Sequence, residues 1–174
     1  MAKRIKVAVA GASGRMGQEV VKMVLNDPEL ELVAAIDRSN VGTDIGRLVG
    51  KDECGVRVNG DLEKALVESR PDVMVDFTTP HAVLENGRIA IRHNVRPVIG
   101  TTGLKQEHIE ELDMLCKQQG IGGVIAPNFS IGAVLMMKFA AIAAKYMPHV
   151  EIIEYHGDQK LDAPSGTSIK TAEW

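Results

Sequence analysis

The chain has 174 residues, a formal net charge of −3, 45% hydrophobic residues and 25% charged residues. This length suits one full domain and little more, and the composition is typical of globular proteins. The slight negative charge and the 3% content of aromatic residues argue against nucleic acid or an anionic membrane as a partner.

Short β-branched runs alternate with longer helical stretches along the chain. Residues 5–10 are small or β-branched throughout, as in a buried strand. Residues 16–26 carry apolar side chains at helical spacing and end before Asp27-Pro28. The glycine-rich residues 41–60 show no period and predict a long surface loop. The other predicted strands are 32–36, 73–77, 98–100, 123–126 and 150–156, and the other predicted helices are 62–67, 82–93, 106–119 and 131–147.

Strands separated by helices predict an α/β fold, with a Rossmann-like, doubly wound parallel sheet. Ligands bind such sheets outside the carboxyl ends of the strands. The segments predicted at those ends are all small, polar or glycine-bearing. They are residues 11–17, Asp37-Arg38, Thr78-Thr79-Pro80, Thr101-Thr102-Gly103 and Pro127-Asn128-Phe129-Ser130.

The first of these segments is a GxxGxxG turn between the first predicted strand and helix. Gly11 permits the tight exit from the strand, Gly14 lets the backbone approach a pyrophosphate, and Gly17 lets the helix pack on the sheet. The amides at the helix start would hold the anion. A turn that serves chain geometry alone is the alternative, and the strand–turn–helix context favours a dinucleotide. The predicted cofactor contacts here are Gly11, Ala12, Ser13, Gly14, Arg15 and Met16.

Asp37 lies roughly 20 residues beyond the turn, where an acid binds the ribose hydroxyls of NAD. Arg38 could pair with the 2′-phosphate of NADP or stack on adenine. Both are therefore predicted cofactor contacts, and the preference between NADH and NADPH stays open.

The two cysteines, Cys54 and Cys116, lie far apart and lack metal-ligand spacing. We expect both to be reduced and predict no metal site. The apolar run after the basic residues at the N-terminus covers only residues 7–10, which is too short for a signal peptide. No apolar run is long enough to cross a bilayer. We therefore expect a cytoplasmic protein that makes no membrane contact.

Residues 154–167, with the sequence EYHGDQKLDAPSGT, closely resemble the signature of the 4-hydroxy-tetrahydrodipicolinate reductase (dihydrodipicolinate reductase) family. Residues 11–17, 76–80, 100–103 and 126–130 resemble that family's cofactor segments, in the same order. The resemblance covers the whole chain. It implies further cofactor contacts from Gly100, Thr101, Thr102, Ala126, Pro127, Asn128 and Phe129.

The resemblance implies a reductase that transfers hydride from NADH or NADPH to a cyclic imine dicarboxylate. Its product would be tetrahydrodipicolinate, in lysine and diaminopimelate biosynthesis. His156 would donate or accept a proton, and Lys160 would donate a proton and bind substrate. Ser165, Gly166 and Thr167 would hold a substrate carboxylate. These residue types suit the roles, because imidazole titrates near neutrality and the amides that open a helix bind carboxylates.

Two departures from the family pattern stand out. The family has two consecutive histidines where this chain has His156 and Gly157, so no substrate role passes to Gly157. The resemblance also implies a dinucleotide-binding domain at 1–130 and only the beginning of an α+β substrate domain at 131–174. Family members form homotetramers through that second domain. We therefore expect cofactor binding to be retained better than catalysis or assembly.

Two other readings stay open at this point. The first is another oxidoreductase on the same fold. A short-chain dehydrogenase or sugar epimerase would need a tyrosine four positions before a lysine, but Tyr155 precedes Gln159 and Tyr146 precedes Val150 at that spacing. A homoserine- or aspartate-type dehydrogenase would leave residues 156–167 unexplained. The second reading is a dinucleotide-binding fragment or sensor without turnover.

Overall fold

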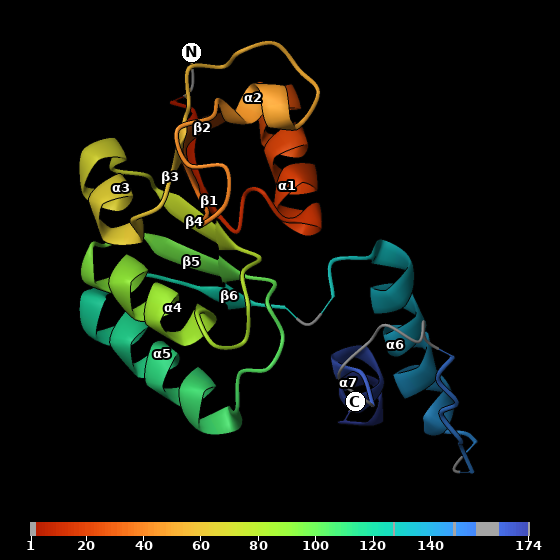
Figure 1. Cartoon of the computed structure of the whole chain (residues 1–174). Helices are drawn as coiled ribbons and strands as arrows, with labels where there is room; N and C mark the ends of the chain where they lie inside the picture. Colours follow the sequence, from red (N-terminus) through yellow and green to blue (C-terminus); the bar gives the residue numbers. More distant parts are fainter. Residues whose placement is uncertain (1–2, 127, 148, 156–163, 174) are drawn as a thin grey trace. The chain divides into compact units, whose positions relative to one another are not determined.

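The computed structural model describes residues 3–126, 128–147, 149–155 and 164–173 (Figure 1). The chain divides into two compact units, Met1–Ile125 and Ala126–Trp174.

The first unit is built on a parallel sheet with the strand order β3-β2-β1-β4-β5-β6. This order reverses at β1, as in the doubly wound dinucleotide-binding fold. The structure therefore confirms the predicted Rossmann-like class. The strands are β1 (Ile5–Ala10), β2 (Leu30–Ile36), β3 (Val58–Asn59), β4 (Val73–Asp76), β5 (Arg96–Ile99) and β6 (Val124–Ile125).

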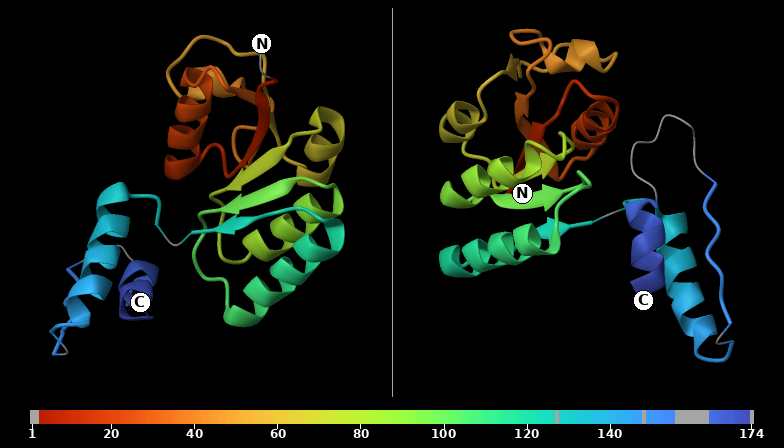
Figure 2. Two further views of the ribbon diagram at one scale, coloured as in Figure 1. Left: turned by 180° about the vertical axis from the view of Figure 1, so that it is seen from behind. Right: turned by 60° about the horizontal axis from the view of Figure 1, so that its bottom comes forward.

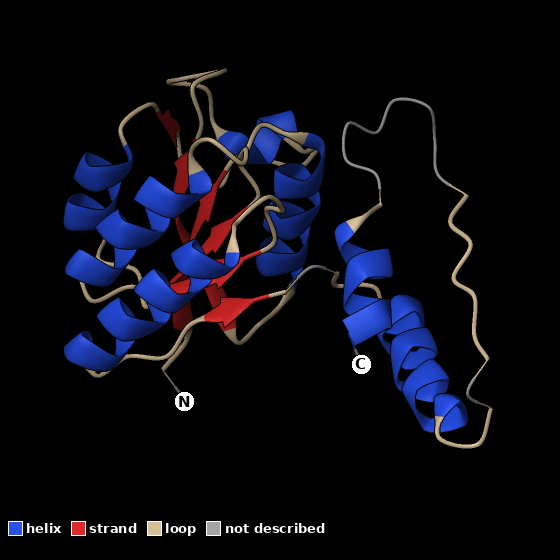
Figure 3. Ribbon diagram, turned by 90° about the horizontal axis from the view of Figure 1, so that it is seen from below, coloured by secondary structure: helices blue, strands red, loops and turns tan. Residues whose placement is uncertain are grey.

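Helices cover both faces of this sheet (Figure 3). Side chains alternate between the two faces of a strand, so Val7 and Val9 pack in one core cluster while Ala8 and Ala10 pack in another. The valines meet α1 through Val21, and the alanines share their cluster with residues of α3 and α4. The helices of this unit are α1 (Arg15–Asn26), α2 (Ile45–Leu48), α3 (Leu62–Ser69), α4 (Val83–Arg92) and α5 (Gln106–Gln119).

The prediction of an uninterrupted loop over residues 41–60 was wrong, because α2 and β3 lie within it. Helix α2 has four residues and β3 has two, too few for either to show a period in the sequence. Asp44 starts α2 by accepting a hydrogen bond from the Gly46 amide at 2.9 Å. Strand β3 pairs with the end of β2, where Ile36 lies opposite Asn59.

The second unit contains α6 (Ile131–Ala144) and α7 (Gly166–Glu173), which lie side by side (Figure 2). The predicted strand at 150–156 was wrong for its described part, because residues 150–155 form no strand. Valine and isoleucine favour strands, but a strand also needs a ladder partner. No described segment pairs with residues 150–155 in this way. Their apolar side chains are accordingly exposed, as at Ile153 and Tyr155.

Candidate functional site

The glycine turn leaves β1 at the centre of the sheet. Gly11 has a φ of +78°, a conformation that favours glycine. The Gly11 and Ala12 amides donate to the carbonyl of Ile36 at 2.8 and 3.1 Å, which joins the turn to the end of β2. A Cβ at Gly11 would overlap the carbonyl oxygen of Phe77. The turn is therefore packed between the strands on both sides of β1.

Helix α1 begins with exposed amides. The first helical bond runs from the Gln18 amide to the Gly14 carbonyl at 2.9 Å. Gly14 occupies the N-cap position and provides no side-chain cap. No described residue accepts from the amides of Arg15, Met16 and Gly17, while residues 14–16 are exposed. Unpaired amides at the positive end of a helix form an anion site, so the turn fits the pyrophosphate expected from the sequence.

Asp37 follows β2 and contacts this turn directly. One carboxylate oxygen accepts from the Ser13 amide at 3.0 Å, and the other accepts from the Ser39 amide at 2.9 Å. Ser13 Oγ also donates to the Ser39 carbonyl at 3.2 Å. A carboxylate offers about four lone-pair sites, so Asp37 can still accept from the hydroxyls of a ribose.

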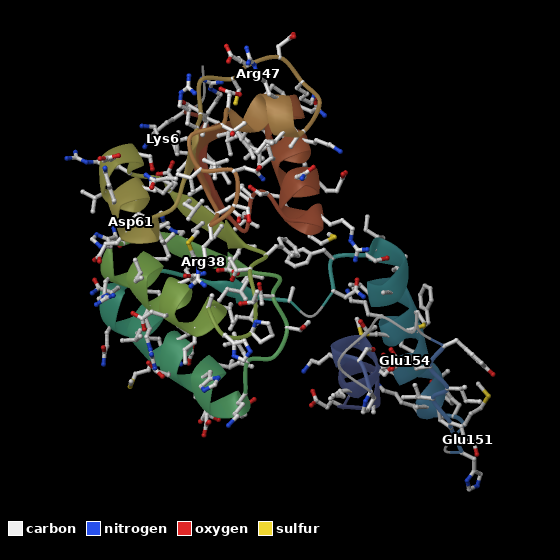
Figure 4. All side chains as sticks on the ribbon, in the orientation of Figure 1. Lys6, Arg38, Arg47, Asp61, Glu151 and Glu154 are labelled. Atoms are coloured by element: carbon white, nitrogen blue, oxygen red, sulfur yellow. The ribbon has the colours of Figure 1, made fainter. Side chains whose placement is uncertain are left out.

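Four of the predicted cofactor contacts, Gly11, Gly14, Asp37 and Arg38, line a cleft of about 410 Å³. The other predicted contacts of the first unit are not among its lining residues, namely Ala12, Ser13, Arg15, Met16, Gly100, Thr101 and Thr102. Arg38 is exposed and lines this cleft with Asp37 (Figure 4). Ligand sites are commonly clefts of about this size. The lining residues are Ala10, Gly11, Gly14, Ile36, Asp37, Arg38, Gly60, Leu62, Phe77, Thr78, Thr79, Ala82 and Asn86.

The loops after β4 and β5 meet at a buried acid that the sequence analysis did not single out. Asp76 is fully buried and accepts from Thr78 and Thr101 side chains at 2.7 and 2.8 Å. The Gly100 amide donates to the Asp76 carbonyl at 2.9 Å. Thr101 is half-buried and Thr102 is exposed. An acid at the end of a buried strand with a threonine two positions later was the available signal, because such an acid binds nearby amides and hydroxyls.

In the second unit, Asn128 links a predicted cofactor segment to a predicted substrate segment. Its side-chain oxygen accepts from the Ser130 amide at 2.7 Å, and its side-chain nitrogen donates to Thr167 Oγ1 at 2.9 Å. Ala126 is half-buried and Phe129 is 50% exposed.

Ser165 forms the start of α7. It is 5% exposed, and its Oγ accepts from the Ser168 amide at 3.1 Å, as an N-cap does. Its own amide donates to Oε2 of Glu154 at 2.9 Å. Figure 4 labels Glu154. No described residue accepts from the amides of Gly166 and Thr167. The predicted carboxylate turn therefore does open a helix, with two amides available to an anion.

The candidate site residues Pro127, His156 and Lys160 lie outside the described residues, and so does Gly157. The described part of the chain contains no group of three or more His, Cys, Asp or Glu residues able to hold a metal. None of the described helices has the length and apolar character that a membrane crossing requires.

The strand order, the glycine turn and the cleft define the first unit as a Rossmann-type dinucleotide-binding domain. The family model "Dihydrodipicolinate reductase, N-terminus" matches residues 5–129, and "Dihydrodipicolinate reductase, C-terminus" matches residues 132–174. The chain therefore belongs to the dihydrodipicolinate reductase family.

Individual relatives agree with this assignment. The chain is 54% identical over 173 residues to 4-hydroxy-tetrahydrodipicolinate reductase of Desulfitobacterium hafniense, covering 99% of this chain and 65% of the relative. A dipicolinate-bound dihydrodipicolinate reductase from Paenisporosarcina sp. TG-14 is 49% identical with a TM-score of 0.80, covering 98% of this chain and 64% of that one. GenD2 from gentamicin A biosynthesis, in complex with NAD, is 25% identical with a TM-score of 0.66, covering 81% and 40%. The chain thus spans about 65% of the length of the curated relatives that it matches.

Proposed function

We propose that this chain is the cofactor-binding part, with the substrate loop, of an NADH- or NADPH-dependent 4-hydroxy-tetrahydrodipicolinate reductase. The observation that carries the proposal is the glycine turn at the reversal point of the sheet, which donates the Ser13 amide to Asp37 and opens a helix that has no side-chain cap. The names of the similar reductases supply the reaction, and the NAD complex of GenD2 supplies the cofactor class. The reaction belongs to lysine and diaminopimelate biosynthesis.

The residues of the first unit would hold the dinucleotide. The turn from Gly11 to Met16 would bind the pyrophosphate through its amides. Asp37 would accept from the adenosine ribose, and Arg38 would pair with a 2′-phosphate or stack on adenine. The remaining cofactor contacts are proposed at Gly100, Thr101, Thr102, Ala126, Pro127, Asn128 and Phe129. When bound, the nicotinamide supplies a hydride.

The residues of the second unit would hold the dicarboxylate and move the proton. The turn formed by Ser165, Gly166 and Thr167 would bind one carboxylate through its hydroxyls and the amides of Gly166 and Thr167. Glu154 and Asn128 hold this turn. His156 and Lys160 carry their roles from the family motif. Lys160 would offset one of the two negative charges of the substrate and deliver a proton to the ring nitrogen, while His156 would donate or accept a proton. The dipicolinate bound to the similar reductase supports a substrate of this class.

Assembly and location are further parts of the proposal. We propose a homotetramer, as the family resemblance implies, with a small dicarboxylate as the substrate. We place the activity in the cytoplasm, in keeping with the free cysteines Cys54 and Cys116.

The alternative function is a dinucleotide-binding module without turnover. The observation behind this alternative is that the chain spans 65% of the length of the reductase from Desulfitobacterium hafniense. The decisive experiment measures NADH binding by fluorescence alongside NADH oxidation with freshly generated substrate. Binding with turnover supports the reductase. Tight binding without turnover at any protein concentration supports the module instead.

A substitution tests the proton role within the same assay. We expect His156→Gln to lower kcat strongly and leave NADH affinity unchanged. His149→Gln is the matched control, because His149 is an exposed histidine with no proposed chemistry. Equal activity of the His156→Gln variant and the unsubstituted protein would exclude the role assigned to His156.

A further inference from the structure

Asp76 is a buried carboxylate with an unusually complete set of hydrogen bonds. Its exposed fraction is 0%. One oxygen accepts from the Thr78 amide at 2.9 Å, from Thr78 Oγ1 at 2.7 Å and from Thr101 Oγ1 at 2.8 Å. The other accepts from Asn86 Nδ2 at 2.8 Å. A buried charge is tolerated only when such partners replace water.

These donors come from three different segments at the carboxyl edge of the sheet. Thr78 lies in the loop after β4, Asn86 lies on α4, and Thr101 lies in the loop after β5. Thr78 and Asn86 also line the cleft, whereas Asp76 does not. Asp76 therefore lies behind the wall of the cleft and joins two segments that line it, the loop after β4 and α4, to the loop after β5, which does not line it.

We propose that Asp76 is a positioning residue for the nicotinamide half of the cofactor, an inference that rests on the proposed function. In a sheet of this order the two mononucleotide-binding halves lie on opposite sides of the reversal point. Asp37, at the end of β2, serves the adenosine half. Asp76, at the end of β4, belongs to the other half and acts through Thr78 and Thr101 without touching the ligand.

A purely structural role for Asp76 is the competing explanation, and Asp44 provides the matched comparison. Asp44 is also a buried acid, with 4% exposure. It accepts from the amides of Gly46, Cys54 and Gly55 at 2.9, 3.1 and 2.9 Å. None of these residues lines the cleft. D44A therefore removes a comparable buried carboxylate of the same unit without disturbing the cleft.

The test compares binding of NADH with binding of ADP, which occupies the adenosine half only. Titrations by fluorescence and calorimetry would use the unsubstituted chain, D76A, D76N, T101V and D44A. Hydrogen bonds to charged groups contribute enough that D76A should weaken NADH binding roughly tenfold or more. ADP binding should change less than about twofold, because the contacts of the adenosine half are intact. T101V removes one donor and should give a smaller loss for NADH alone.

D76N provides the rescue. Its side-chain oxygen can accept from the same three donors, and rotation of the Asn86 amide would let that side chain accept from the new amide. We therefore expect D76N to recover most of the NADH affinity lost in D76A. D44A should lower the unfolding temperature without changing NADH affinity.

The possible outcomes separate the inference from the function beneath it. Equal losses for NADH and ADP, or unchanged NADH binding in D76A and T101V, would overturn the positioning role. If D76A does not fold, the T101V and D76N variants test the positioning role in its place. NADH binding that is unchanged in T101V would overturn this role. So would a D76N variant that binds NADH and ADP more weakly by the same factor. An unsubstituted chain that binds ADP but neither NADH nor NADPH would overturn the proposed function itself, and the inference with it.

Discussion

Gly17→Ala tests whether the close approach of α1 to the glycine turn creates the anion site. A Cβ at Gly17 would overlap the Gly11 carbonyl oxygen, and it would lie 2.7 Å from the Gly11 carbonyl carbon and 2.9 Å from Ala12 Cα. All three are backbone atoms, which cannot rotate away as the end of a side chain can. The helix and the turn must therefore separate to admit the methyl group.

Two opposing effects set the magnitude. Alanine favours the helix over glycine by up to about 1 kcal/mol. Overpacking a close contact costs roughly 1–3 kcal/mol. The added Cβ would lie less than 3 Å from backbone atoms that cannot move aside, so the cost at Gly17 should lie at the upper end of this range. We therefore expect a net loss of unfolding free energy of about 1–2 kcal/mol. For a domain of this size, that lowers the unfolding temperature by roughly 3–10 °C.

The assay pairs thermal unfolding with NADH titration. Displacing the amides of Arg15 and Met16 from the pyrophosphate should weaken NADH binding about tenfold or more. Gly122→Ala is the control, since a Cβ there would have no neighbour within 4 Å. A Gly17→Ala variant that unfolds and binds NADH like the unsubstituted chain would refute the packing argument.

Three further predictions concern single side chains. If the Arg38 guanidinium pairs with the 2′-phosphate, Arg38→Gln should weaken NADPH binding by about tenfold and NADH binding by less than about twofold. Equal losses of NADPH and NADH affinity in parallel titrations would instead indicate stacking on adenine. Burial acts to raise the pKa of the Asp44 carboxyl, but hydrogen bonds from three backbone amides outweigh it and hold the pKa below its ordinary value of 3.8. Because the folded-state pKa is depressed, Asp44 stabilises the fold above this ordinary value, and the contribution is lost as the pH falls through the folded-state pKa. Below pH 3.8, the unfolding free energy of Asp44→Asn should therefore fall less steeply with decreasing pH than that of the unsubstituted chain. Identical slopes for the two proteins would contradict this. Burial, and secondarily the negative charge of Asp113, raises the pKa of the Cys116 thiol. Alkylation of Cys116 at pH 8 should therefore be much slower in the native protein than in urea. Equal alkylation rates would show that the thiol is accessible in the native protein.

Local patterns explain why much of the first unit was predictable. Residues 5–10 and 106–119 coincide with β1 and α5, because each carries a continuous pattern that ends directly before a glycine, Gly11 or Gly120. The start of α1 was predictable for the same reason, because the glycine turn separates the predicted strand from the predicted helix. The hydrogen bond from the Ser13 amide to Asp37 was not predicted. The short elements α2 and β3 were not predictable from such patterns.

Contacts between distant segments escaped the sequence analysis. Asp76 and Thr101 are 25 positions apart, and only the pairing of β4 with β5 brings them together. The same dependence on tertiary partners explains the error at residues 150–155, where β-branched residues predicted a strand and no described segment pairs with them. Asn128 and Thr167 are 39 positions apart, so their bond could be found only in the folded chain.

The contacts that hold the two predicted binding turns lie in different units, and this has a consequence for function. The glycine turn is held by Ile36, Asp37 and Ser39, all within the first unit. The turn at Ser165 is held by Glu154 and Asn128, all within the second. A site already ordered before binding avoids the loss of affinity that ordering a loop entails. Destabilising α7 should therefore impair the carboxylate turn and the proposed cofactor contact of Asn128, which donates to Thr167. The affinity for ADP should stay unchanged, because the described contacts that order the glycine turn all come from the first unit.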